Sequence, residues 1–216
     1  MGWFGSKKSY DRTRILEDAR KAARKGDHTR AIAHFERVQE VEPHNTDVLR
    51  KLAAERAQAG QRAEAWRDYR RAGEALAGRG FVDQAIGVYR EAATHLSNEA
   101  EVWEALSDLE VARKRTPDAV AVLLEGCRHF RSRRTRQQAL SLLHRARRLD
   151  PSHFEANFGL ASLLAKSGAR ARALRILDEL TRTARGRNLR RVRSRQLLLS
   201  PTPAAAWRWI ASLATA

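Results

Sequence analysis

The residues best suited to chemistry in this sequence are arginines near its C-terminal end. The stretch from Thr181 to Gln196 contains seven arginines and no acidic residue. A guanidinium placed on a phosphate releases counterions, so the stretch predicts an anion-binding segment with salt-dependent affinity. No aromatic side chain accompanies these arginines, which argues against specific reading of nucleic acid. A solvated, disordered linker is the alternative interpretation. The candidate anion-binding residues are Arg187, Arg190, Arg191, Arg193 and Arg195.

Positive charge is concentrated in one part of the chain. The net charge is +17, and residues 128–216 hold 19 Arg and one Lys against four acids. A second stretch, from Arg128 to Arg148, holds eight arginines and no acid. This asymmetry predicts an anionic partner for the C-terminal part, which would be an acidic protein surface, nucleic acid or an anionic membrane.

Catalytic and metal-binding patterns are not found in the sequence. The seven histidines are scattered, and none forms a metal-ligand pair at helical spacing. The single cysteine, Cys127, allows no disulfide within the chain and reads as a packing residue. We therefore expect no enzyme, cofactor, metal or small-molecule substrate. With neither a secretory signal nor an apolar run of about 18 residues, we expect a cytoplasmic protein.

The element that must position these residues is a repeat of 54 residues. Ala31, Ala85 and Ala139 are 54 residues apart, and each is followed four residues later by Phe, Tyr or Leu. Small residues suit sites where two helices cross closely, and the larger residue one turn later fills the neighbouring gap. Two further series keep the same step; they are Ala65, Ala119 and Ala173, and Leu52, Leu106 and Leu160.

Each repeat unit is predicted to hold three helices. Apolar residues recur at three- and four-residue steps, as on one face of a helix, and no strand pattern is visible. Gly26, Gly60, Gly78-Arg79-Gly80 and Gly168 stand where left-handed caps end helices. The predicted helices cover residues 11–25, 28–41, 45–59, 61–78, 81–95, 99–114, 116–130, 135–149, 153–167 and 170–184.

The helical pattern resembles the tetratricopeptide repeat, which reads Trp-x2-Leu-Gly-x2-Tyr, then Ala-x3-Phe, then Pro. Trp103, Leu106, Ala119 and Leu123 match it in order and spacing, and further matches begin at Ala19, Leu49 and Asn157. The resemblance covers residues 12–184 and implies an all-α fold, a right-handed α-α superhelix of ten helices with a basic C-terminal tail. The family steps by 34 residues, whereas this chain alternates steps of 34 and 20. Helices 61–78 and 116–130 would each serve two repeats, and altered curvature is expected there.

The same resemblance implies a binding groove on the concave face formed by the first helix of each pair. We therefore expect a non-catalytic scaffold or adaptor that binds a peptide or helix of another protein, with an acidic segment as one option. Ala54 and Asp108 replace the Asn with which some family members clamp a terminal carboxylate, so that mode is not expected. The groove residues carried over by position are Arg20, Arg24, Arg50, Gln58, Glu101, Glu104, Asp108, Phe158 and Lys166.

Four segments are predicted: an N-terminal segment (1–10), the repeat domain (11–184), an Arg-rich linker (185–202) and a short amphipathic helix (203–216). That helix would cap the solenoid, dock on a partner or lie on a membrane surface. The leading hypothesis is the scaffold. The alternative is a module that associates with nucleic acid or an anionic membrane through its basic C-terminal end.

Overall fold

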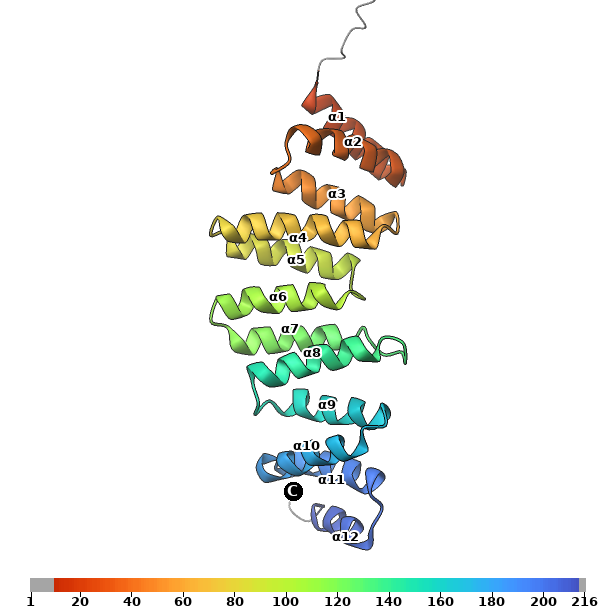
Figure 1. The fold of residues 1–216 in the computed structure, drawn as a ribbon, viewed down its shortest axis with the longest axis vertical. Coiled ribbons are helices and arrows are strands. Elements are labelled where there is room, and N and C mark those ends of the chain that lie inside the picture. The colour runs from red at the N-terminus through yellow and green to blue at the C-terminus, as the bar shows by residue number, and fades with distance from the viewer. Residues whose placement is uncertain (1–9, 214–216) are drawn as a thin grey trace, which may run out of the picture. The chain divides into compact units, whose positions relative to one another are not determined.

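The computed structural model describes residues 10–213, so most of the predicted N-terminal segment, with Trp3, and residues 214–216 lie outside it. Within the described range the chain forms α-helices joined by turns, without strands. The predicted all-α repeat fold is confirmed (Figure 1). The helices are α1 (Arg12–Arg24), α2 (His28–Val41), α3 (Thr46–Gln58), α4 (Arg62–Gly78), α5 (Val82–His95), α6 (Ala100–Ala112), α7 (Thr116–Cys127), α8 (Arg136–Leu149), α9 (Phe154–Lys166), α10 (Arg170–Thr183), α11 (Gly186–Leu199) and α12 (Pro203–Ala211).

The helices fall into two compact units, Met1–Val102 and Trp103–Ala216. Within the first unit α1 to α5 pack in chain order, each against the helix before and after it. The second unit repeats this arrangement from α7 to α12. Neighbour-to-neighbour packing is the property that defines a helical repeat array.

The repeated small residues lie in the helix contacts. Ala31, Ala65 and Ala85 of the first unit are fully buried, as are Ala119 and Ala173 of the second. Gly73 of α4 shows how close two helices come, because a Cβ there would overlap the ring of Tyr89 on α5. The leucine series is also buried, with Leu52 and Leu160 fully covered. The 54-residue pattern therefore marks the core.

Left-handed residues end several helices. Gly60 follows α3 with φ of 79°, and Gly168 follows α9 with φ of 86°. Lys114 follows α6, occupies the same place in the 54-residue repeat, and has φ of 60°. Its neighbour Arg115 donates a backbone hydrogen bond of 2.9 Å to Glu110, as expected of a left-handed helix cap. A side chain at this backbone conformation is strained because Cβ approaches the following carbonyl.

The linker predicted over residues 185–202 is wrong, because residues 186–199 form helix α11. Val192 is fully buried, and Leu189 and Leu199 pack against the same apolar cluster of the second unit. These three residues give α11 an apolar stripe that its many arginines mask in the composition. Long arginine stems lie along apolar surface while the charged groups reach water, so an Arg-rich helix can still pack.

The short C-terminal helix is present as α12. Thr202 caps it by accepting a hydrogen bond of 3.1 Å from the Ala205 amide. Trp209 Nε1–H donates to Ser194 Oγ of α11 at 2.9 Å. Helix α12 thus docks on the chain's own α11, while Trp207, Ile210 and Leu213 stay exposed.

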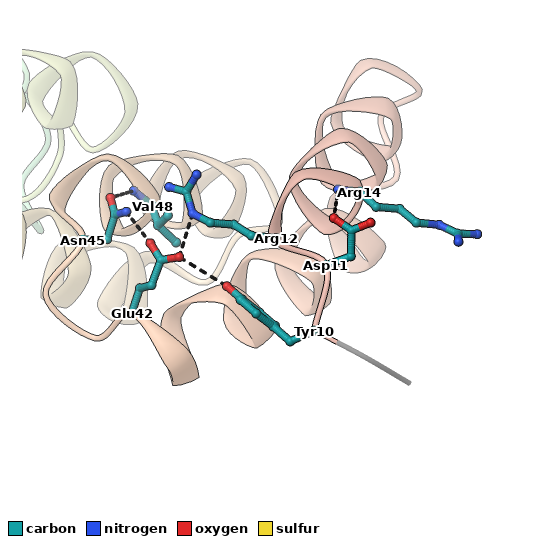
Figure 2. A network of polar contacts seen from close by, with 7 residues as sticks. All are labelled: Tyr10, Asp11, Arg12, Arg14, Glu42, Asn45 and Val48. Atoms are coloured by element: carbon teal, nitrogen blue, oxygen red, sulfur yellow. Dashed lines mark hydrogen bonds and ion pairs between the residues drawn. The ribbon is translucent and has the colours of Figure 1, made fainter. Parts of the chain in front are cut away.

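A polar network fastens the start of α1 to the turn between α2 and α3 (Figure 2). The Glu42 carboxylate accepts hydrogen bonds from Asn45 Nδ2 at 2.7 Å, Arg12 Nε at 2.6 Å and the Tyr10 hydroxyl at 3.3 Å. Asn45 in turn caps α3 through the Val48 amide at 3.2 Å. The hydrogen bond from Asn45, followed by that from Arg12, lowers the pKa of Glu42.

Replacing the strained cap residue Lys114 by glycine is expected to stabilise the protein. Glycine adopts the left-handed conformation without the Cβ clash, so Lys114→Gly should raise the free energy of unfolding by about 1 kcal/mol. Lys114→Ala removes the same charge but keeps Cβ and serves as the control. Chemical denaturation measures the free energy of unfolding of both variants. An equal change in the two would show that backbone strain at residue 114 does not lower the stability.

The Glu42 network makes a pH-dependent contribution to stability. The folded-state pKa of Glu42 lies below its ordinary value of 4.5, so the contribution is complete above that pH. It is lost as the pH falls through the lower folded-state pKa. Glu42→Gln should therefore lower the melting temperature at pH 7, with a deficit that shrinks in acid. Glu40→Gln, at an exposed residue with no partner among residues 10–213, is the control; matching curves would contradict the prediction.

Candidate partner-binding surfaces

Three residues predicted for the basic start of the groove line one cavity in the first unit, which we call the Arg20 cavity. Helices α1 and α3 supply Arg20, Arg24 and Arg50, which line one hollow of about 390 Å³. Its apolar surface comes from Ala23 and Ala54, and from Phe35, which is only 2% exposed. The small alanines leave space between the charged side chains. Ala19 and Ala53 of the same two helices are fully buried, so helix packing fixes the positions of the charged residues on α1 and α3. The remaining lining residues are Lys51, Glu55 and Glu91.

The acids of this cavity are engaged within the unit. Glu91 accepts from Arg50 Nη1 at 2.8 Å and from the Tyr69 hydroxyl at 3.4 Å. The hydrogen bond to Glu91 raises the pKa of Arg50. Glu55 Oε2 lies 2.8 Å from Nδ1 of His28. Both carboxylates therefore have local partners.

Three cations of the cavity lack such partners. Arg20, Arg24 and Lys51 form no ion pair or side-chain hydrogen bond within residues 10–213. Sequence reasoning selected Arg20 and Arg24 but missed Lys51, which directly follows Arg50 on α3. The cavity can therefore attract an anionic group and offer it guanidinium and ammonium donors.

The acidic residues predicted for the middle of the groove have hydrogen-bond or ion-pair partners within the described part of the chain. In the first unit Glu101 accepts from Trp66 Nε1 at 2.7 Å, beside a separate cavity of about 420 Å³. In the second unit Glu104 accepts from Ser141 Oγ at 3.0 Å, and Asp108 forms an ion pair with Arg145. The other predicted residue, Gln58, is exposed, and its Nε2 lies 3.4 Å from His95 Nδ1 in the first unit. None of these four lines the Arg20 cavity.

Helix α11 covers the groove position of Phe158. Arg191 places its guanidinium 4.6 Å from the Phe158 ring centroid, and that of Arg195 lies at 6.0 Å. Arg191 also donates two hydrogen bonds to Glu155, at 2.5 and 2.9 Å. These bonds lower the pKa of Glu155 and raise that of Arg191. Arg191 therefore holds α11 on α9.

The other predicted anion-binding residues lie along α11. Arg193 donates to Gln196 at 3.1 Å; burial, and then the nearby charge of Arg208, lower its pKa. Arg187 is exposed and Arg190 half-buried, and neither forms an ion pair or a side-chain hydrogen bond in the described part of the chain. The structure thus separates the five arginines into those used in packing and those still available.

A second basic cavity lies in the second unit, where sequence reasoning noted only a charged stretch. Arg133, Arg134 and Arg136 line it together with Lys166, a residue predicted for the groove. Its volume is about 550 Å³. Lys166 lies far along the sequence from the arginines, so no spacing rule joins them.

The structure shows no arrangement typical of catalysis around Cys127. Its thiol is largely buried, donates to the Ala139 carbonyl at 3.6 Å, and has its pKa raised by burial to about 12. Among residues 10–213 no three His, Cys, Asp or Glu side chains are grouped as metal ligands. No helix in that range is both long and apolar enough to cross a bilayer.

Comparison with known proteins gives two family matches. One tetratricopeptide repeat model matches residues 132–195, and another matches residues 70–128. No curated protein matches the sequence.

Solved structures with similar folds include MamA, with 17% identity, 91% of this chain and 93% of that chain covered, and a TM-score of 0.35. A tetratricopeptide repeat protein from Parabacteroides merdae has 16% identity, coverages of 94% and 93%, and a TM-score of 0.32. TTC0263 from Thermus thermophilus has 17% identity, coverages of 94% and 99%, and a TM-score of 0.28. Scores this low transfer neither detailed geometry nor function.

The contacts of Arg191 give a test of how α11 is held. Arg191→Gln removes the ion pair with Glu155 and the cation on Phe158, so amide hydrogen exchange in α11 should become faster. Arg190→Gln removes the same charge from a neighbour without an acidic partner and should leave exchange unchanged. Mass-spectrometric hydrogen exchange measures both variants. Equal protection of α11 in Arg191→Gln and the wild type would show that Arg191 does not anchor the helix.

Proposed function

We propose that this chain, which belongs to the tetratricopeptide repeat superfamily, is a protein-interaction scaffold that binds an acidic peptide segment in the Arg20 cavity. The observation that carries the proposal is the set of three cations, Arg20, Arg24 and Lys51, that surround an apolar floor without acidic partners. An extended peptide or short helix would place carboxylates on these cations and a small apolar side chain against Ala23 and Ala54.

The charge balance of the cavity supports an acidic rather than a basic ligand. The Glu91 carboxylate already accepts hydrogen bonds from Arg50 and Tyr69. The Glu55 carboxylate lies within hydrogen-bond distance of His28. A basic peptide would have to displace these contacts, whereas an acidic one adds contacts to free donors. Complementary charge also raises the association rate and suppresses wrong partners.

The wider roles stay predictions. Binding of nucleic acid or an anionic membrane by the C-terminal end, and a cytoplasmic location, have no observation in their favour beyond charge and the sequence pattern. A protein partner is supported by the family to which the chain belongs and by the chemistry of the cavity.

Reversing two charges of the cavity tests the proposal. The full-length protein and the double variant Arg24→Glu/Lys51→Glu would be used to capture proteins from source cells, followed by affinity measurement on the segment that each captured protein contributes. We expect the double variant to lose at least about tenfold in affinity, because each reversal replaces an attraction by a repulsion.

The matched control is Arg14→Glu/Arg37→Glu, which makes the same charge change at exposed residues of α1 and α2 outside the cavity. It should bind like the wild type. Equal losses of affinity in both double variants would show that the effect comes from net charge and not from the cavity. Unchanged affinity in Arg24→Glu/Lys51→Glu would exclude the cavity as the binding site.

A further inference from the structure

The charged residues that line the second basic cavity are all cations, and the proposed binding of an acidic peptide in the Arg20 cavity gives it no role. Four cations, Arg133, Arg134, Arg136 and Lys166, surround a single hollow of about 550 Å³, and no acidic residue lines it. Like charges held together repel each other, so such a cluster costs stability until an anion binds. The Arg20 cavity differs, because two of its lining residues are carboxylates.

The packing of the second unit sets two of these cations in place. Arg136 begins α8 and donates from Nη1 to the carbonyl oxygen of Lys166 at the end of α9, at 2.7 Å. This bond satisfies one of the terminal carbonyls of α9 and holds the two helix ends at the same cavity. Arg136 keeps further N–H groups for a ligand, since a guanidinium carries five.

Arg133 and Arg134 have no such structural task. They lie in the connector between α7 and α8, are exposed, and have no hydrogen-bond or ion-pair partner within residues 10–213. The connector is held by other residues, because Ser132 accepts from the Thr135 amide at 3.1 Å and Arg131 donates to the Arg128 carbonyl at 2.9 Å. Two adjacent guanidinium groups therefore face the cavity region with their donors unused.

We propose that this cavity binds a phosphorylated serine or threonine side chain of a partner protein. A phosphate monoester carries nearly two negative charges and three acceptor oxygens, which match several guanidinium donors better than one carboxylate does. The volume leaves room for the residue that bears the phosphate, and the Gln137 amide can bond the peptide main chain beside it.

The lining disfavours other carriers of phosphate. No aromatic side chain borders the cavity, so nucleic acid bases have no surface on which to stack. Its one apolar lining residue, Leu140, is 8% exposed, which leaves little apolar side-chain surface for an acyl chain. The cavity lies in the second unit and the Arg20 cavity in the first, so each proposal can fail without the other.

The test uses the full-length protein and a fluorescein-labelled peptide of glycine and alanine with one central phosphoserine. Fluorescence anisotropy compares it with the same peptide carrying serine or glutamate. We expect the phosphopeptide to bind most tightly, and Arg133→Glu/Arg134→Glu to weaken it by at least about tenfold. Arg172→Glu/Arg175→Glu is the control, since it makes the same charge change at exposed residues of α10 outside the cavity.

Three outcomes would overturn the proposal: equal affinity for the phosphorylated and serine peptides, equal losses in the two double variants, or tighter binding of a single-stranded RNA or a phosphatidylserine vesicle that depends on Arg133 and Arg134. Thermal unfolding of both variants shows whether they are folded. If the reversal variant does not fold, Arg133→Gln/Arg134→Gln replaces it, with the same order of affinities expected.

Discussion

The close approach of neighbouring helices is the constraint on which the rest of this structure depends. It requires small side chains at the crossings, and Ala65, Ala85 and Gly73 provide them in the first unit. A helix in such an array buries its apolar stripe only against the helices on either side of it, so stability is built step by step along the chain. Both basic cavities take their geometry from this packing.

Helix stacking also brings together polar residues that are 36 or 37 residues apart in the sequence. Arg62 with Glu99, Asp108 with Arg145, and Glu155 with Arg191 are ion pairs of this kind. Of the acidic residues predicted for the groove, Asp108 is neutralised in this way. The cations outnumber the acids, and some of the cations without partners line the Arg20 cavity and the cavity of Arg133 and Arg134.

Helix α11 shows how composition can hide a packed element. Its arginines resemble those of a solvated linker, and its net charge favours disorder when it is considered alone. In the folded chain Val192 is buried, and Arg191 bonds to Glu155 while it covers Phe158. The segment is ordered because α9 and α10 supply an apolar surface and a carboxylate that the local sequence does not reveal.

The sequence by itself determined the helices between residues 11 and 184, most of their breaks and the repeated residues of the core. Ala31, Ala85 and Ala139 recur because each helix crossing needs a small side chain, and all three are buried in the structure as their spacing predicts. The tertiary structure decided which charges remain available, because that depends on contacts such as Arg50 with Glu91, which lie on different helices. It also decided that Lys166 meets Arg133 and Arg134, since only the packing of α8 on α9 brings these helix ends to one cavity.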